Sequence, residues 1–240
     1  TNKPFLPINH LEGHLLSSSY NNKICNPHIA FLLTGGHTQI YLINSVGKYK
    51  LLGETLDDAI GEAFDKVAKL LEMPYPGGPE IEKKAKKGDE KSFELPHPLK
   101  QKKSLNFSFS GIKTAVNLIV KKQNKIDEKF KYDISASFQK TIMDIIEFKI
   151  NLSIKYLKNQ NINISQISLV GGVASNQYIY KKVKKIANNY SCSVVVPPKY
   201  MLSDNAAMIG WACIQKYQKE PISDLYFEEN PRLQIVNNLK

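Results

Sequence analysis

The sequence predicts an α/β protein in which helices flank a mixed β-sheet. Three strand-like runs come early, at residues 29–34, 38–43 and around 50–52, and the rest of the chain alternates helical segments with short apolar runs. An antiparallel meander followed by strand–helix alternation is typical of a mixed sheet and excludes a helical bundle or a β-sandwich. With 240 residues, the chain suffices for one large domain or two modest lobes.

In the first half, turn residues and hydrophobic periodicity define the expected elements. Residues 9–19 predict a short helix, and Gly35-Gly36-His37 predicts a tight turn between the first two strands. Residues 56–71 carry apolar side chains at three- and four-residue spacing, which predicts an amphipathic helix. Pro76-Gly77-Gly78-Pro79 breaks that pattern before a charged helix, and residues 88–106 predict a loop.

The second half alternates helices and strands. Residues 111–120 and 134–157 predict helices, the second long and amphipathic. Residues 167–170 predict an apolar strand that leads through two glycines into a basic helix. Residues 193–196 predict a last strand, and residues 204–217 a last helix.

Composition narrows the class of protein. The net charge of +11 fits a polyanionic partner such as RNA, but Arg232 is the only arginine, and a lysine-rich composition is also what an AT-rich genome produces. Cys25, Cys192 and Cys213 are scattered and odd in number, which argues against a disulfide framework and fits a reducing compartment. We expect neither a membrane span nor a signal peptide, and the start at Thr1 suggests a fragment or a processed chain.

His10 and His14 are the sharpest local signal. Positions i and i+4 share one helix face, as two ligands of a single metal ion require. A zinc peptidase of the H-E-x-x-H type has its glutamate directly after the first histidine. Here Glu12 lies roughly 200° around the helix from His10, so we expect it to point away from the ion. The spacing alone leaves a metal site and two surface histidines open.

Two glycine pairs, Gly35-Gly36 and Gly171-Gly172, follow strand-like runs. Paired glycines allow a ligand to approach the backbone and direct N–H groups at an anion, although the first pair also suits a hairpin turn. Together they predict two walls of a nucleotide site.

Between the two glycine pairs in sequence, Asp58, Glu62 and Asp65 recur along one predicted helix face. One of these carboxylates could enter a polar site, and the alternative is an acidic stripe that faces solvent.

Asp204 is a candidate third ligand. It lies at the start of the last predicted helix, where a role in capping would explain it fully. It could instead supply the oxygen ligand that the two histidines lack. The segment Phe107-Ser108-Phe109-Ser110-Gly111 predicts an aromatic loop entering a helix, and its residues indicate no chemistry.

Taken together and in this order, the segments resemble one family, the tRNA N6-adenosine threonylcarbamoyltransferases, formerly described as glycoproteases or O-sialoglycoprotein endopeptidases. They span nearly the whole chain in register, so chance is not a plausible explanation. The matching segments are His10-Leu11-Glu12-Gly13-His14, Gly35-Gly36-His37-Thr38-Gln39, Leu51-Leu52-Gly53-Glu54-Thr55-Leu56-Asp57-Asp58, Gly61-Glu62-Ala63-Phe64-Asp65-Lys66, Tyr75-Pro76-Gly77-Gly78-Pro79, Phe107-Ser108-Phe109-Ser110-Gly111-Ile112-Lys113-Thr114, Gly171-Gly172-Val173-Ala174-Ser175-Asn176 and Ser203-Asp204-Asn205-Ala206-Ala207-Met208-Ile209.

The resemblance implies an actin-like, Hsp70-like ATPase fold built of ribonuclease-H-like lobes, with the first lobe incomplete. Residues 1–28 are then the histidine-bearing helix of the first lobe. Residues 29–200 form the second lobe, with a helical insertion around 80–160, and residues 201–240 form a helix and tail that return to the first lobe.

The resemblance also implies a set of site residues. His10, His14 and Asp204 would bind one divalent metal ion per subunit, Fe²⁺ or Zn²⁺. An adenine nucleotide or threonylcarbamoyl-AMP is the implied ligand, and no residue is expected to act as a covalent nucleophile. The implied substrate contacts are Leu32, Leu33, Thr34, Gly35, Gly36, Asp65, Gly78 and Asn176.

The implied reaction transfers the threonylcarbamoyl group from threonylcarbamoyl-adenylate to N6 of adenosine 37 in tRNAs that read codons beginning with A. The implied partners are tRNA and, in a bacterium, a paralogous subunit and a small ATPase, with no membrane. We expect a bacterial cytoplasm, with an organelle as the alternative. A catalytically silent scaffold paralogue is less favoured because all three candidate ligands are present, and a metallopeptidase because Glu12 is displaced.

The sequence departs from the family's pattern at both ends. The family opens with a strand and a phosphate-contacting turn upstream of the histidine helix, which are not found here, so we expect the chain to be inactive alone. The family's C-terminal arginine-proline-arginine stretch appears only as Asn230-Pro231-Arg232, which weakens any tRNA role there.

Overall fold

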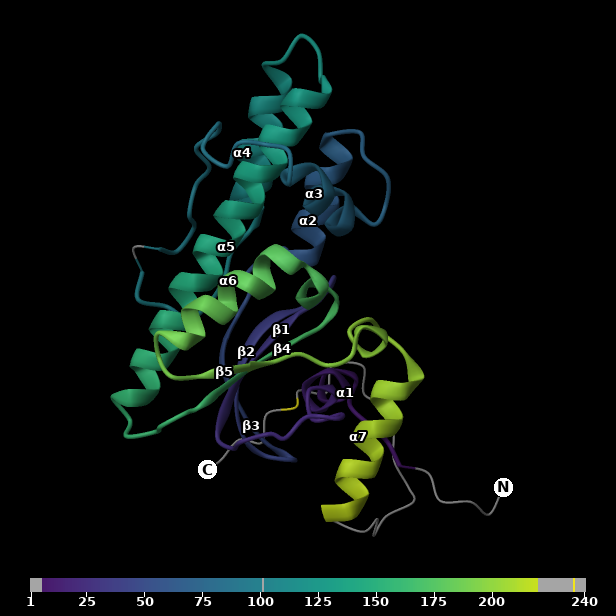
Figure 1. Ribbon diagram of the computed structural model, residues 1–240, viewed down its shortest axis with the longest axis vertical. Coiled ribbons are helices and arrows are strands. Elements are labelled where there is room, and N and C mark those ends of the chain that lie inside the picture. The colour runs from purple at the N-terminus through teal and green to yellow at the C-terminus, as the bar shows by residue number, and fades with distance from the viewer. Residues whose placement is uncertain (1–5, 101, 220–234, 236–240) are drawn as a thin grey trace.

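The computed structural model describes residues 6–100, 102–219 and 235 (Figure 1). Apart from residue 235, the predicted C-terminal tail that follows residue 219 lies outside the described residues, and with it Asn230-Pro231-Arg232. The elements are α1 (His10–Ser17), β1 (His28–Leu33), β2 (Thr38–Ser45), β3 (Lys48–Glu54), α2 (Ile60–Leu70), α3 (Gly77–Ala85), α4 (Ser110–Lys121), α5 (Glu128–Lys158), β4 (Gln166–Val170), the 3-10 helix η1 (Gly172–Ser175), α6 (Gln177–Asn188), β5 (Ser193–Val195), the 3-10 helix η2 (Lys199–Met201) and α7 (Ala206–Lys219).

The predicted mixed sheet is confirmed. Five strands lie in the order β3-β2-β1-β4-β5. The pairs β1–β2 and β2–β3 are antiparallel and form the expected meander, whereas β1–β4 and β4–β5 are parallel. The strand β1 is therefore central, and each of its residues is buried.

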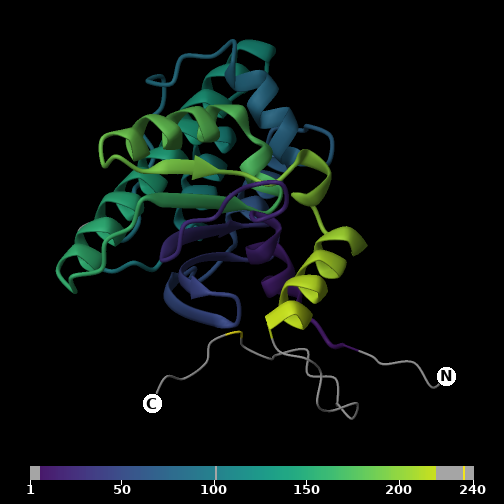
Figure 2. The same ribbon diagram turned by 60° about the horizontal axis from the view of Figure 1, so that its bottom comes forward.

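The two faces of the sheet are covered unequally. On β1, Ile29, Phe31 and Leu33 join a large apolar cluster with helices α2 to α6. Ala30 and Leu32 join a smaller cluster to which α1 and α7 contribute. Figures 1 and 2 show α1 and α7 lying together on one side of the sheet, apart from α2 to α6. The candidate metal ligands belong to the side with the smaller cluster.

Helix boundaries differ from the predicted ones where local hydrogen bonds compete. The helix α2 begins at Ile60, later than periodicity suggested, because Thr38 accepts the amide of Thr55 at 2.8 Å with its carbonyl and the amide of Ile60 at 2.8 Å with its hydroxyl. The helix α5 begins earlier than expected, because the carboxylate of Asp127 caps it by accepting the Phe130 amide at 2.8 Å.

The sequence predicts that Pro76-Gly77-Gly78-Pro79 ends one helical segment and precedes a charged helix. The helix α3 instead begins inside this segment, at Gly77, with Pro79 in its first turn, where the missing N–H of proline costs no intrahelical bond. Among the described residues, no helix combines the length and the apolar character that a bilayer crossing needs.

Candidate metal centre and ligand pocket

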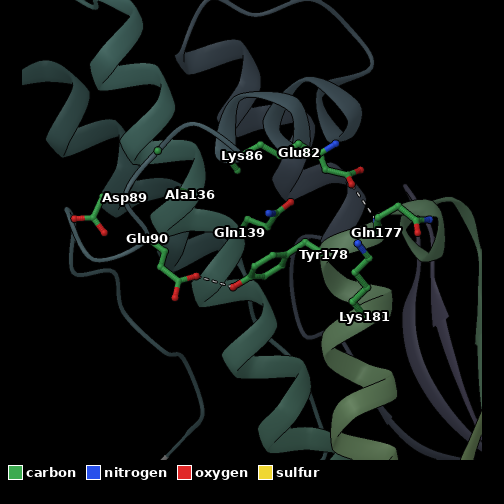
Figure 3. A pocket seen from close by; sticks show the side chains of 11 residues that line it. Glu82, Lys86, Asp89, Glu90, Ala136, Gln139, Gln177, Tyr178 and Lys181 are labelled. Carbon is green, nitrogen blue, oxygen red and sulfur yellow. Dashed lines mark hydrogen bonds between the residues drawn. The ribbon is translucent and has the colours of Figure 1, made fainter.

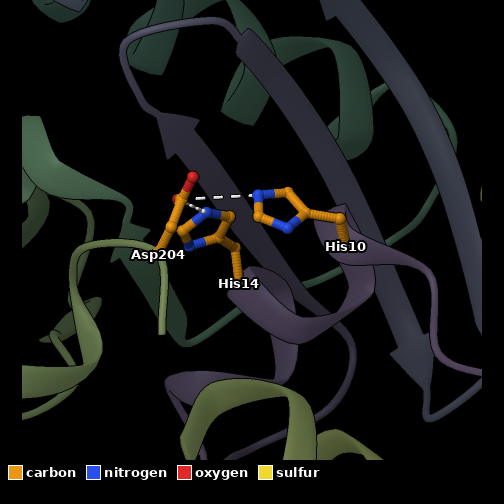
Figure 4. Close-up of side chains that lie close together, drawn as sticks. All are labelled: His10, His14 and Asp204. Atoms are coloured by element: carbon orange, nitrogen blue, oxygen red, sulfur yellow. Dashed lines mark hydrogen bonds and ion pairs between the residues drawn. The ribbon is translucent and has the colours of Figure 1, made fainter. Parts of the chain in front are cut away.

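The two histidines lie on one face of α1, as their spacing predicts (Figure 4). The side chain of Asn9 starts this helix by accepting the amide of Leu11 at 2.9 Å. The rings of His10 and His14 are 5.0 Å apart between centroids and nearly perpendicular. His14 is almost fully buried, whereas the side chain of His10 is half exposed. The buried ring of His14 and the half-exposed ring of His10 therefore lie next to each other on the same side of α1.

Asp204 joins the pair from the far end of the chain (Figure 4). Its Oδ1 lies 2.9 Å from Nε2 of His14 and 3.5 Å from Nε2 of His10. The capping role that would have explained Asp204 belongs to its neighbour, because Oδ1 of Asn205 accepts the amide of Met208 at 3.0 Å. Asp204 thus precedes α7 with its carboxylate turned toward α1.

These three side chains fit a divalent metal ion. One ligand atom from each residue lies within 4.8 Å of the others. Two imidazole nitrogens and one carboxylate oxygen suit Zn²⁺ or Fe²⁺, and tetrahedral ligands at about 2.1 Å from an ion stand roughly 3.4 Å apart. Burial lowers the pKa of His14 and outweighs the carboxylate of Asp204, which raises it. A neutral imidazole is the form that binds metal.

Glu12 points away from the histidines, as the helical geometry predicts. It is 3% exposed, and its two carboxylate oxygens accept the hydroxyl of Tyr49 at 2.9 Å and the ammonium of Lys216 at 3.2 Å. A glutamate held in this way does not face the space between His10 and His14. The arrangement required for an H-E-x-x-H peptidase is therefore not present on α1.

A cavity of about 510 Å³ reaches one of the three candidate ligands, Asp204. Asp204 lines it and also contacts both histidines, so the cavity and the candidate metal centre form one continuous site. Of the predicted substrate contacts, those that line the cavity are Thr34, Gly35, Asp65, Gly78 and Asn176.

The first wall of the cavity is the turn after β1. The hydroxyl of Thr34 accepts the amides of Gly36 at 3.2 Å and His37 at 2.8 Å, which fixes the turn. Gly61 of α2 packs directly behind it, since a Cβ at that position would lie 2.8 Å from Cα of Gly35. The helix α2 and the turn are thus held in close contact.

The second wall follows β4. Gly171 has φ +91°, and a Cβ there would lie 2.5 Å from the carbonyl oxygen of Leu33, so only glycine suits this approach of β4 to β1. Asn176 then caps α6 by accepting the amide of Ile179 at 3.0 Å, and its side-chain amide donates to Gln139 at 2.9 Å. These bonds fix the orientation of Asn176 beside the cavity.

The acidic residues in α2 and just before it either form ion pairs with Lys66 or line the cavity. Lys66 forms ion pairs with Asp58 and Glu62, both at 2.8 Å. Asp65 lines the cavity, where its Oδ1 accepts the amide of Gly77 at 2.7 Å. Because α2 begins only at Ile60, Asp58 precedes the helix rather than lying on its face.

The other predicted contacts lie elsewhere. Leu32 and Leu33 are 0% exposed and their side chains belong to the apolar clusters on opposite faces of the sheet. Gly36 is exposed in the turn and does not line the cavity. Conversely, Tyr75 and Glu82 do line it, although sequence reasoning did not select them. For Glu82 a signal existed, because it lies one helical turn after Gly78.

A second cavity, of about 420 Å³, lies on the other side of Glu82 between α3, α5 and α6 (Figure 3). Glu82 accepts the amide of Gln177 at 3.0 Å, and Glu90 accepts the hydroxyl of Tyr178 at 2.9 Å. Both carboxylates therefore have partners within this part of the protein. The cavity is removed from His10 and His14, and Glu82 is the residue that it shares with the ligand pocket.

Comparisons with known proteins place the chain beside one family. A family model described as tRNA N6-adenosine threonylcarbamoyltransferase matches residues 1–211. Relatives of that name include proteins from Rickettsia rickettsii (strain Sheila Smith), 42% identical over 98% of this chain and 70% of the relative, and from Pelagibacter ubique (strain HTCC1062), 44% identical over 96% and 64%. A relative from Bartonella bacilliformis is 41% identical over 99% and 67%.

Solved structures support the fold. Full-length HypF in its phosphate- and nucleotide-bound form superposes with a TM-score of 0.66 at 14% identity, over 92% of this chain and 37% of that one. The HypF of T. kodakarensis gives 0.55 at 14% identity, over 87% and 36%. At such identity the likeness concerns the fold alone, and it confirms the predicted actin-like fold.

Proposed function

The chain belongs to the tRNA N6-adenosine threonylcarbamoyltransferase family, and from this premise we propose that it transfers a threonylcarbamoyl group from threonylcarbamoyl-adenylate to N6 of adenosine 37 in tRNA. The observation that carries the proposal is the convergence of His10, His14 and Asp204 at the edge of the cavity. A site that joins metal ligands to a pocket of this size suits an adenylate with a reactive acyl group at one end.

In this proposal the adenylate occupies the cavity between the two glycine walls. Gly35 and Gly78 have no side chain to obstruct a ligand, and a Cβ at either position would meet nothing within 4 Å. The side chains of Asp65 and Asn176 already have hydrogen-bond partners within the protein, so they are oriented before a ligand binds. Such preorganisation lowers the entropic cost of holding the substrate.

The chemistry requires no covalent nucleophile from the chain. The N6 amine forms a bond to the carbamoyl carbon, the bond from that carbon to the phosphate oxygen breaks, AMP leaves, and the amine loses a proton. A bound Fe²⁺ or Zn²⁺ would act as a Lewis acid toward substrate oxygens in this step. His10, His14 and Asp204 would hold that ion, and Asp204 would link it to the cavity.

The remaining parts of the proposal come from the family. We propose tRNAs that read codons beginning with A as acceptors, and a paralogous subunit and a small ATPase as partners in a bacterial cytoplasm. The three converging side chains favour an active transferase over a silent scaffold, because a scaffold would have no need to keep a metal-ligand set together. The position of Glu12 disfavours the peptidase alternative.

A transfer assay tests this function. The chain, joined to the family's upstream strand and phosphate-contacting turn and loaded with metal, is combined with tRNA, threonylcarbamoyl-adenylate labelled in its threonine, and the paralogous subunit and ATPase of a related bacterium. We expect label on tRNA from the wild type and a loss of at least about 100-fold for Asp204→Ala, the scale of removing a group that organises catalysis.

His97→Ala is the matched control, because the partly buried His97 pairs with Asp144 and does not line the ligand pocket. This variant should transfer label as the wild type does. Transfer that survives Asp204→Ala unchanged, or peptide cleavage that depends on Glu12, would contradict the proposed function.

A further inference from the structure

Glu12 lies between the two histidines in sequence but on the opposite side of α1. Each of its carboxylate oxygens has a partner from a different element: Tyr49 belongs to β3 and Lys216 to α7. The carboxylate is almost completely buried, while Lys216 is about one-third exposed. The helix α1 is thus tied both to the sheet and to α7 through one side chain.

Two further contacts hold α7 against α1 and the turn that follows α1. A Cβ on Gly13 would lie 2.8 Å from Cδ1 of Ile209, so the absence of a side chain there permits the approach. The indole N–H of Trp211 donates to the hydroxyl of Ser19 at 2.8 Å. The pair of Glu12 and Lys216 adds a charged hydrogen bond to this contact, and such bonds are stronger than neutral ones.

Asp204 depends on this contact for its position. Its side chain is 72% exposed, and within the described residues its carboxylate forms hydrogen bonds or ion pairs only with His10 and His14. It directly precedes Asn205, which caps α7. Whatever holds α7 against α1 therefore sets the distance between Asp204 and the histidines.

We propose that Glu12 is a positioning residue for the metal centre. Through Lys216 it fixes α7, and hence Asp204, relative to α1, and through Tyr49 it fixes α1 relative to the sheet. The inference rests on the proposed function in one respect, since it takes His10, His14 and Asp204 as metal ligands. It assigns Glu12 no contact with substrate or metal.

Zinc binding tests the proposal without any assay of activity. The dissociation constant of Zn²⁺ is measured by competition with a chromophoric chelator for the wild type, Glu12→Gln and Glu12→Ala. We expect Glu12→Ala to weaken binding by about 10- to 100-fold, the range seen when the outer partners of a metal site are removed. Glu12→Gln keeps an acceptor for Tyr49 and should lose less.

The route of the effect is tested with Lys216→Met. This variant should weaken Zn²⁺ binding about as much as Glu12→Gln, and the double variant should be no weaker than either single one, because both remove the same link. The visible spectrum of bound Co²⁺ should change in Glu12→Gln, in Lys216→Met and in the double variant, since this spectrum reports ligand geometry rather than stability.

Asp127→Ala is the matched control. It removes the cap of α5, on the other side of the sheet, and should lower the melting temperature while leaving the Zn²⁺ affinity and the Co²⁺ spectrum unchanged. Equal affinities in the wild type and Glu12→Ala would overturn the positioning role alone. A loss of affinity in Asp127→Ala as large as in Glu12→Ala would also overturn it. A wild type that binds no Zn²⁺ would overturn the metal centre as well.

Discussion

The two faces of the central sheet differ in what holds them together. On one face, helices α2 to α6 and the strands share a large cluster of buried apolar side chains. On the other face, among the described residues, α1 and α7 contribute the buried Leu15, Leu16 and Ala212, with the partly buried Leu11, to a much smaller cluster. The first face has the apolar burial that stabilises a domain, whereas the second has specific contacts at Glu12 and Gly13.

Because of this difference, global stability and the candidate metal centre depend on opposite faces of the sheet. The candidate metal ligands all come from the face with the smaller cluster or from the segment that enters α7. Regions with few buried apolar contacts open more readily than the core, and sites that must admit large substrates are often found there. We therefore expect substitutions on the first face to change global stability, and those on the second to change the metal centre.

The largest expected effect is from Phe138→Ala on the first face. Phe138 is 0% exposed and packs edge-to-face on Phe64 with ring centroids 5.0 Å apart. The free energy of unfolding should fall by about 3–5 kcal/mol, measured by urea denaturation. Leu118→Ala is the control, because Leu118 is 56% exposed and should cost under about 0.5 kcal/mol. A loss below about 1 kcal/mol for Phe138→Ala would mean that this cluster does not dominate stability.

His28 makes the second face sensitive to acid. Burial lowers the pKa of His28 to about 4, whereas an unfolded histidine titrates near about 6.5. Between these values the unfolded chain binds a proton that the folded chain does not, so stability falls as the pH decreases from 6.5 to 4. The expected loss is about 3 kcal/mol and should be much smaller in His28→Gln, measured by urea denaturation across that range. If both proteins have the same pH profile, His28 is not the responsible group.

Gly13→Leu should disturb the contact of α1 with α7. The new side chain would collide with Ile209, and overpacking of this kind costs about 1–3 kcal/mol. Hydrogen exchange should accelerate in α1 and α7 but not in α5, and Zn²⁺ binding should weaken. Gly210→Ala on α7 meets nothing within 4 Å and should stabilise by up to about 1 kcal/mol. Equal acceleration in α5 would contradict the separation of the two faces.

The smallest expected effect is at Asp57. Its carboxylate accepts the hydroxyl of Ser108 at 2.5 Å and the amide of Phe109 at 2.7 Å, and so holds the start of α4. Burial raises the pKa of Asp57, but these hydrogen bonds outweigh it and lower the pKa overall. Asp57→Ala should cost about 1 kcal/mol at neutral pH, with unchanged Zn²⁺ affinity. The loss should diminish in acid as the carboxylate is protonated, and a loss independent of pH would contradict the role.

The sequence predicted what depends on neighbours along the chain. The strand β1, the helix α1 and the direction of Glu12 away from the histidines all follow from local periodicity. The hydrogen bonds of Asp57 to the Phe-Ser-Phe-Ser-Gly segment could not be foreseen, because Asp57 and Phe109 lie 52 residues apart. For the meeting of His14 with Asp204, 190 residues away, the residues left a ligand role and a capping role open, and the family resemblance decided between them.

Burial also limited the prediction of the site. Leu32 and Leu33 stand next to Thr34 in the motif, yet the alternation of a strand sends their side chains into opposite apolar clusters. The cavity begins only at Thr34, where the strand ends and the backbone turns. A motif therefore identifies the segment at a site, and the geometry of the strand decides which of its side chains reach the ligand.

The central claim is that His10, His14 and Asp204 form one metal centre at the edge of the ligand cavity. X-ray absorption at the zinc edge, on the chain loaded with one equivalent of Zn²⁺, tests it most directly. We predict imidazole nitrogen and carboxylate oxygen at about 2.0–2.2 Å, and loss of an imidazole contribution and of affinity in His14→Ala. Sulfur ligation at about 2.3 Å, or a spectrum that His14→Ala leaves unchanged, would contradict it.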